Sequence, residues 1–286
     1  MSISQAHGGH YYLPKPSPYP ALMSTALLLL GAGGALAVNG YVLPAGWLAG
    51  AGGLLVVYVL SGWVGDVIRE NRRGVYGEKE GVSFRWGMGW FIASEVIFFS
   101  SLFGVLFYER NIAVPWLASL NSHYSPWAGF KAVWPTSGPA GAAFTPEHAW
   151  GIPALNTLIL LSSGVTVTWG LQQITKGHRR AATWAVGATI LLGGVFLALQ
   201  CREFYLAYTE LHLTLGSGVY GATFFILTGF HGLHVTIGMI MLSVIFGRCL
   251  KGHFGPDNHF GFEAVSWYWH FVDVVWLMLF IFVYWL

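Results

Sequence analysis

Charged side chains are scarce in this sequence. Only 9% of its 286 residues are Asp, Glu, Lys or Arg, whereas about a quarter of the residues are charged in typical soluble domains. Hydrophobic residues make up 55% of the chain, and the mean hydropathy is +0.58. This composition excludes an ordinary soluble protein and predicts a chain that crosses a membrane several times. The net charge of +2 is too small to indicate nucleic-acid binding.

Cofactor-binding patterns are scarce too. No cluster of Cys and His has the spacing of a zinc site. The glycine-rich dinucleotide motif and the Walker motif are both missing. We therefore expect no metal site in this chain. The start of the sequence lacks a charged segment followed by a short apolar core and a cleavage site, so we expect no cleaved signal peptide.

Apolar stretches long enough to cross a ~30 Å hydrocarbon core occur seven times. They cover residues 19–38, 42–67, 83–108, 149–174, 182–205, 215–247 and 260–286. The sequence thus predicts an all-α polytopic membrane protein with seven transmembrane helices.

Polar segments separate the predicted helices. Residues 1–18 read as an N-terminal tail, 68–82 as an inner loop and 109–148 as a long outer loop. The first two spans, over residues 19–67, are rich in Gly and Ala. Small residues allow helices in lipid to approach closely, so we expect these two spans to pair. Tolerance of glycine in membrane helices explains the composition equally well.

Basic residues are distributed unevenly between the two sides of the predicted topology. The tail and the loops after spans 2, 4 and 6, with Arg85, hold eleven Lys and Arg, and the opposite side holds three. Because basic residues concentrate on the inner side of membranes, the N-terminus is predicted to be cytoplasmic and the C-terminus outside. Cys201 and Cys249 then lie near opposite faces, too far apart for a disulfide.

Ionisable residues interrupt the last apolar stretch, residues 259–286. Glu263, His270 and Asp273 fall on one side of a helical wheel, together with His259 and Trp267. Ionisable groups are costly in the hydrocarbon region and normally face protein, water or a partner. We therefore expect this side to pack against the other helices.

Further polar groups lie near the middle of other spans. Glu95, His231 and the serines at 162 and 163 all fall at about the depth of Asp273. This layer fits a proton relay or an ion or cofactor site, and it fits equally a hydrogen-bond network that only fixes packing. His231 is the best predicted partner of Glu95, with the polar side of the last span second.

Histidines inside the spans raise the question of heme. His231, His234 and His270 are near one another in predicted depth, and two of them on different helices could bind iron axially. Heme-binding bundles usually contain more such histidines. We therefore expect His231 and His234 to donate to neighbouring carboxylates or carbonyls.

Long motifs resemble those of one family, subunit III of the heme-copper cytochrome c oxidases. They are WVGDVIRE (63–70), SEVIFF (94–99), NTLILLSSGVTVTW (156–169), GVYGATFFILTGFHGLHVTIG (218–238) and GFEAVSWYWHFVDVVW (261–276). They occur in order over nearly the whole chain. With seven spans, the chain is similar to the seven-helix form of the family.

The resemblance implies an architecture and a role. A two-helix bundle and a five-helix bundle over residues 83–286 would form a V-shaped cleft that holds phospholipids. This subunit would carry no heme or copper, which belong to the catalytic partner. It would contact mainly subunit I, and also subunit II, of an enzyme that oxidises cytochrome c, reduces oxygen and pumps protons. It would stabilise the catalytic subunit and support proton uptake.

Specific residues follow from the same resemblance. Glu95 matches the intramembrane glutamate of the family, and Arg248 matches a basic residue expected at a lipid phosphate. Trp63 is a third predicted lipid contact. Possible proton-exchanging residues are Glu95, His231, His234, Glu263, His270 and Asp273, and no catalytic residue is expected in this chain.

Three alternatives stay open at this point. The chain could be a similar component of a quinol or nitric oxide reductase, an independent proton-coupled transporter using Glu95 and Asp273, or a heme-bearing enzyme that acts alone. A bacterial inner membrane is the expected location, with the mitochondrial inner membrane as the alternative.

Overall fold

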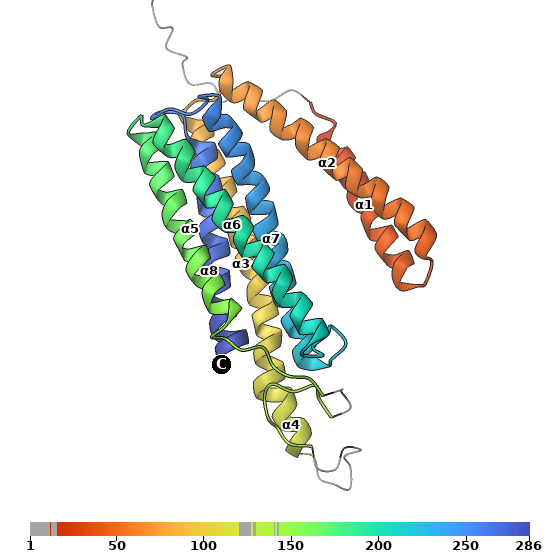
Figure 1. Ribbon diagram of the computed structural model, residues 1–286. Helices are drawn as coiled ribbons and strands as arrows, with labels where there is room; N and C mark the ends of the chain where they lie inside the picture. The colour runs from red at the N-terminus through yellow and green to blue at the C-terminus, as the bar shows by residue number, and fades with distance from the viewer. Residues whose placement is uncertain (1–11, 13–15, 120–126, 128–129, 140, 142) are drawn as a thin grey trace, which may run out of the picture. The chain divides into compact units, whose positions relative to one another are not determined.

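Helices account for the regular secondary structure of the described residues. The computed structural model describes residues 12, 16–119, 127, 130–139, 141 and 143–286. Seven of its helices are long and apolar enough to cross a membrane, which confirms the predicted all-α, seven-helix class (Figure 1). Most of the predicted tail, with His7 and His10, and part of the predicted outer loop lie outside the described residues.

The helix boundaries follow the predicted spans with shifts of a few residues. The helices are α1 (Tyr19–Val38), α2 (Val42–Arg72), α3 (Glu78–Tyr108), α4 (Val114–Ser119), α5 (Ile152–Thr175), α6 (Arg179–Thr209), α7 (Val219–Leu250) and α8 (Phe260–Leu279). Two π-helical turns, Glu109–Ala113 and Phe280–Trp285, extend α3 and α8. Helices such as α2 run into polar residues because their backbone hydrogen bonds continue beyond the apolar stretch.

The start of α7 differs from the prediction for a reason that the backbone shows. The helix begins at Val219, four residues after the predicted start, because Gly218 has a φ of +84°. This left-handed conformation ends a right-handed helix, and glycine adopts it without a steric penalty. A Cβ atom at this position would also collide with the carbonyl of Ser137.

Two compact units divide the chain, Met1–Phe84 and Arg85–Leu286. In the first unit, α1 and α2 pack as a pair through glycines. A Cβ on Gly33 would lie 2.8 Å from the backbone nitrogen of Ala49, and one on Gly52 would lie 2.9 Å from the carbonyl oxygen of Ala26. The close approach of these two helices therefore requires glycine at both positions.

Hydrogen bonds tie the polar end of the first unit together. The backbone N–H of Tyr12 donates to Glu80 over 2.6 Å, and its hydroxyl donates to Glu70 over 3.2 Å. Tyr76 also donates to Glu70, over 2.6 Å. Burial, reinforced by the carboxylate of Glu70, raises the pKa of Tyr76. These bonds join the end of α2 to the first turn of α3.

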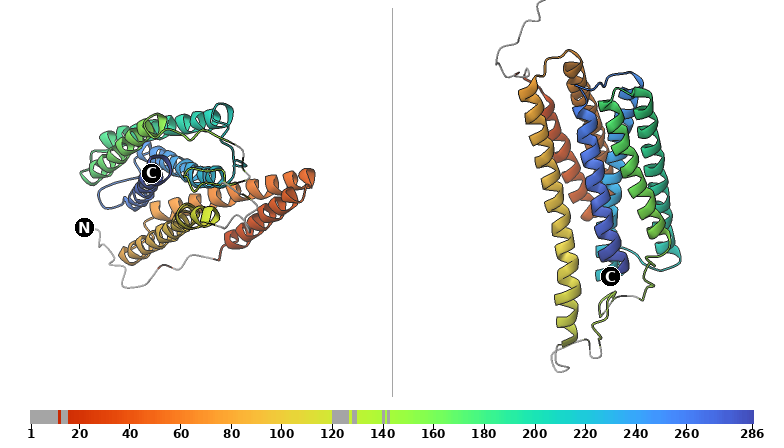
Figure 2. Two further views of the ribbon diagram at one scale, coloured as in Figure 1. Left: turned by 90° about the horizontal axis from the view of Figure 1, so that it is seen from below. Right: turned by 90° about the vertical axis from the view of Figure 1, so that its left-hand side faces the viewer.

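In the second unit, helix α8 packs against the other helices. Helix α6 contacts both α5 and α7, and α8 also contacts both α5 and α7 (Figures 1 and 2). Among the spans of the described residues, α8 has the largest share of its apolar window buried, 56%. The prediction that the last stretch packs against the other helices is confirmed for most of its surface.

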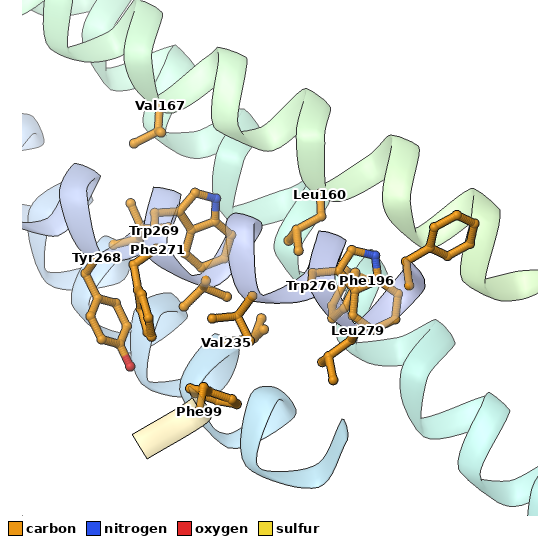
Figure 3. Close-up of a cluster of buried hydrophobic side chains, with 14 of the residues drawn as sticks. Phe99, Leu160, Val167, Phe196, Val235, Tyr268, Trp269, Phe271, Trp276 and Leu279 are labelled. Atoms are coloured by element: carbon orange, nitrogen blue, oxygen red, sulfur yellow. The ribbon is translucent and has the colours of Figure 1, made fainter. Parts of the chain in front are cut away.

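Trp269 is fully buried in the hydrophobic cluster of this unit (Figure 3). Its indole N–H donates to the hydroxyl of Ser163 on α5 over 2.9 Å. The ring fits between two glycines, because a Cβ on Gly193 of α6 or on Gly238 of α7 would lie 2.9 Å from its carbons. A large aromatic ring thus replaces the side-chain volume that these glycines lack, and it joins four helices.

Candidate functional site

An intramembrane pair joins α3 to α7. The Nε2 atom of His234 lies 2.9 Å from Oε2 of Glu95. The side chains are 11% and 21% exposed, so both are largely shielded. The prediction that His231 is the partner of Glu95 is wrong.

The observed start of α7 explains this difference. In a helix that runs from Val219 to Leu250, His234 is 15 residues from one end and 16 from the other. The predicted start at residue 215 placed His231 at the centre instead. The two imidazoles are also 60° apart around the helix axis, so one helix presents them to different neighbours.

His231 has a packing role in this structure. Its side chain is fully buried, and Nε2 donates to the carbonyl oxygen of Val272 on α8 over 3.2 Å. The rings of Phe196 and Trp276 lie 5.8 Å and 5.2 Å from the imidazole, centroid to centroid. This arrangement agrees with the expectation that His231 donates to a neighbouring carbonyl.

The tautomer of His234 follows from its second hydrogen bond. Its Nδ1 atom lies 2.6 Å from the carbonyl oxygen of Phe230, which only accepts hydrogen bonds, so Nδ1 carries a hydrogen. Nε2 then either accepts a hydrogen bond from neutral Glu95 or, when it carries a proton, donates a hydrogen bond to ionised Glu95. In both forms one proton lies between the two side chains and the pair is neutral overall. A neutral pair lowers the cost of placing these groups in the membrane.

Asp273 and His270 form a second polar group, between α8 and α5. Nδ1 of His270 lies 3.6 Å from Oδ2 of Asp273, and Nε2 lies 2.9 Å from the hydroxyl of Thr168. Asp273 packs against the backbone of α5 at Gly164, where a Cβ would overlap Oδ2. The His270 side chain is 43% exposed. We expected the whole polar side of α8 to be covered by other helices. The exposure of His270 shows that this expectation is wrong at that residue.

Glu263, at the start of α8, binds the first residue of the second unit. Nη2 of Arg85 donates to Oε2 over 2.9 Å, and Nε donates to Oε1 over 3.3 Å. This two-point ion pair engages both carboxylate oxygens of Glu263. It fastens α3 to α8 near one end of both helices.

The predicted lipid contacts belong to different units. Trp63 lies on α2 and lines a cavity of about 690 Å³ whose polar wall includes Asp66 and Arg73. Arg248 is in the last turn of α7, and its guanidinium stacks 4.3 Å from the centroid of Phe254. Both residues combine an apolar surface with nearby charge, as contacts to the ester and phosphate region of a lipid require.

The sequence reasoning missed a buried carboxylate near the end of α6. Glu203 is 0% exposed and accepts a hydrogen bond of 2.5 Å from the hydroxyl of Tyr284. It lies two residues before the predicted end of its span, at residue 205. The spacing of seven residues between Phe196 and Glu203 could have indicated this burial, because it places both side chains on one face of α6.

Groups that commonly bind metal are engaged by protein atoms here. Glu95, His234 and Thr168 bind as described above, and in the described part of the chain no group of three His, Cys, Asp or Glu could hold a metal ion. Cys201 is an exposed thiol and Cys249 a buried one. The polar groups formed by Glu95 with His234 and by His270 with Thr168 therefore connect helices through hydrogen bonds.

Comparisons with known proteins identify the family. The family model described as "Cytochrome c oxidase subunit III" matches residues 9–286. A "Cytochrome c oxidase subunit 3" of Marchantia polymorpha is 41% identical over all of this chain and 98% of its own length. Relatives with the same name from Polypterus ornatipinnis and Carassius auratus are 42% and 40% identical over 98% of both chains. The chain belongs to the cytochrome c oxidase subunit III family and is a multi-pass membrane subunit of that oxidoreductase complex.

Proposed function

We propose that this chain works as the non-redox subunit of the oxidase, which stabilises the catalytic subunit, holds phospholipids and supports proton uptake. The observation that carries the proposal is the pair of Glu95 and His234, whose bonding atoms engage each other and the carbonyl of Phe230. A closed, neutral pair suits a structural role beside a lipid cleft. It does not suit a carrier that must open alternately to both sides of the membrane.

The proposed partners are subunit I as the main contact, and subunit II. Heme and copper would be held by these partners, and cytochrome c would deliver electrons to the complex. The interior of this chain supports this division, because His231 and His234 already bind protein carbonyls or a carboxylate. A cofactor would have to displace those bonds.

Phospholipids are proposed to lie between the two-helix and five-helix bundles. Arg248 would meet a phosphate group, Trp63 would contact the region near the ester bonds, and Glu95 would border the cleft. The positive charge in the last turn of α7 and the exposed indole on α2 support these roles. We propose for the two bundles the limits expected from the sequence, residues 19–67 and 83–286.

Membrane orientation is proposed from the distribution of basic residues. The side with eleven Lys and Arg would face the cytoplasm in a bacterial cell membrane, or the matrix if the membrane is mitochondrial. The N-terminus would lie on this side and the C-terminus on the other. The proton uptake that we propose for this subunit belongs to the same inner side.

The test compares the complete oxidase with complexes that carry Arg248→Ala or the charge-preserving Arg248→Lys. We expect Arg248→Ala to lose bound phospholipid and to inactivate sooner during turnover, with an initial oxygen-reduction rate near that of the unmodified enzyme. Arg248→Lys should retain both lipid and lifetime. Equal lipid content and equal lifetime in all three complexes would contradict the proposal.

A further inference from the structure

Three buried polar side chains face the core near one end of α5 and α6. Asn156 of α5 and Glu203 of α6 are 0% exposed, and Gln200 of α6 is 3% exposed. Both amide atoms of Asn156, both amide atoms of Gln200 and Oε2 of Glu203 are buried and have no hydrogen-bond partner among the described residues. Since the large majority of buried polar side-chain atoms in proteins have a partner, these five atoms need an explanation.

The packing of α5 against α6 places Asn156 and Gln200 at the same level. The two helices are antiparallel neighbours (Figure 1), and the hydroxyl oxygens of Thr166 and Thr189 lie 2.8 Å apart between them. Asn156 is ten residues before Thr166, and Gln200 is eleven residues after Thr189. These separations correspond to about 15 and 17 Å in the same direction along the two axes. The two buried amides therefore lie at one depth inside the bundle, and they form no direct hydrogen bond with each other.

Glu203 extends this polar group by one turn of α6. It is three residues after Gln200, so the two side chains are neighbours on the same face of the helix. Its Oε1 atom accepts the hydrogen bond of 2.5 Å from the hydroxyl of Tyr284. The amide of Gln200 also lies near that hydroxyl, but without hydrogen-bonding geometry. Tyr284 belongs to the π-helical turn Phe280–Trp285, and such turns are frequent at functional sites.

Burial limits what can complete the hydrogen bonds of this group. A lipid or a side chain of another protein cannot reach it from outside, because its three residues are at most 3% exposed. A water molecule is small enough to be enclosed, and it both donates and accepts hydrogen bonds. It can therefore satisfy an amide nitrogen or an amide oxygen, whichever way each amide is turned. A metal ion would bind only the oxygen atoms and would leave both amide nitrogens unsatisfied.

We propose that Asn156, Gln200 and Glu203 form an internal hydration site that holds ordered water between α5 and α6. Buried waters typically make about three hydrogen bonds to groups that otherwise lack a partner, and this site offers both donors and acceptors. The water accepts from an amide N–H and donates to an amide oxygen or to Oε2 of Glu203. It thereby connects α5 to the bond between Glu203 and Tyr284. The site is formed by this chain alone, so the inference is independent of the proposed function.

A high-resolution density map of the complete oxidase tests the site directly. We expect a peak at about 2.7–3.2 Å from polar atoms of at least two of the three side chains. An anomalous map of crystals equilibrated with rubidium chloride distinguishes water from a cation, and we expect no rubidium peak at this place. A map without a peak between the side chains, or with a rubidium peak there, would overturn the inference.

Paired substitutions test whether the two amides act through shared water. Asn156→Leu and Gln200→Leu each remove one side of the site, and either change should release the water. We therefore expect the double variant to lose about as much melting temperature as the more damaging single variant. The control combines Gln200→Leu with Cys249→Ala, because Cys249 is buried in the last turn of α7, at the opposite end of the unit. The losses of the control pair should add.

Losses that add in both pairs would show that Asn156 and Gln200 are independent, and would overturn the shared site. If a leucine variant does not assemble, the density map of the unmodified oxidase decides the inference.

Discussion

Replacing Glu95 provides a demanding prediction, because Glu95→Gln should preserve the complex whereas Glu95→Ala should destabilise it. In Glu95→Gln, an amide N–H donates to Nε2 of His234 in place of the carboxyl group. The hydrogen bond, which is 2.9 Å long in the unmodified chain, is kept in this variant, and the pair stays neutral. Since we propose that the redox centres belong to partner subunits, we expect oxygen reduction and pumped protons per electron to stay within about twofold.

Glu95→Ala removes the partner and leaves Nε2 of His234 without its hydrogen bond. The imidazole side chain is only 11% exposed, so water does not easily replace the carboxylate. Stranding a buried polar group costs ~1–3 kcal/mol. That cost corresponds to about a 5- to 150-fold change in the equilibrium between the native and opened subunit.

The assay measures thermal stability and the amount of this subunit that remains in the purified complex. The Glu95→Ala complex should have a lower thermal stability and retain less of this subunit. Adding His234→Ala to that variant should cause little further loss. An alanine variant as stable as the unmodified complex would refute the pairing. A glutamine variant that assembles fully but no longer pumps would place Glu95 on the proton path.

Two further changes carry predictions of their own. Gly238→Ala should lower the free energy of unfolding by about 1–3 kcal/mol, because the new Cβ would lie 2.9 Å from the ring of Trp269. Gly232→Ala on the same helix is the control: its Cβ would meet no atom within 4 Å, so this substitution should be neutral or stabilising. Burial raises the pKa of Glu147 above its ordinary value of 4.5, so the folded state loses stability as the pH rises from about 4.5 through the raised pKa. Glu147→Gln should therefore raise the melting temperature at pH 8 and leave it nearly unchanged at pH 4.

Hydrophobic length predicted the fold well. Seven apolar stretches became seven helices, and the first of them, Tyr19–Val38, has the predicted limits. The start of α7 was missed because it depends on the backbone conformation of Gly218. A glycine in an apolar stretch is equally compatible with a continuing membrane helix, so the sequence did not distinguish the two outcomes.

Polar residues were easier to find than to pair. Glu95 and Asp273 stand out in apolar stretches, and both are central in the structure. Their partners depend on the rotation of neighbouring helices, and a shift of three residues exchanges His231 for His234. Glu203 was missed because its hydrogen bond depends on the helical extension of α8 as far as Trp285, which brings Tyr284 to it.

The central claim is that this chain is a non-redox subunit of a heme-copper oxidase. The most direct test is an optical spectrum of the complex purified through a tag on this chain, followed by spectra of the separated subunits. We expect a Soret band in the complex that stays with a larger partner after separation, while the released chain shows none. A Soret band on the isolated chain, or recovery of a stable and complete protein without partners, would contradict the account.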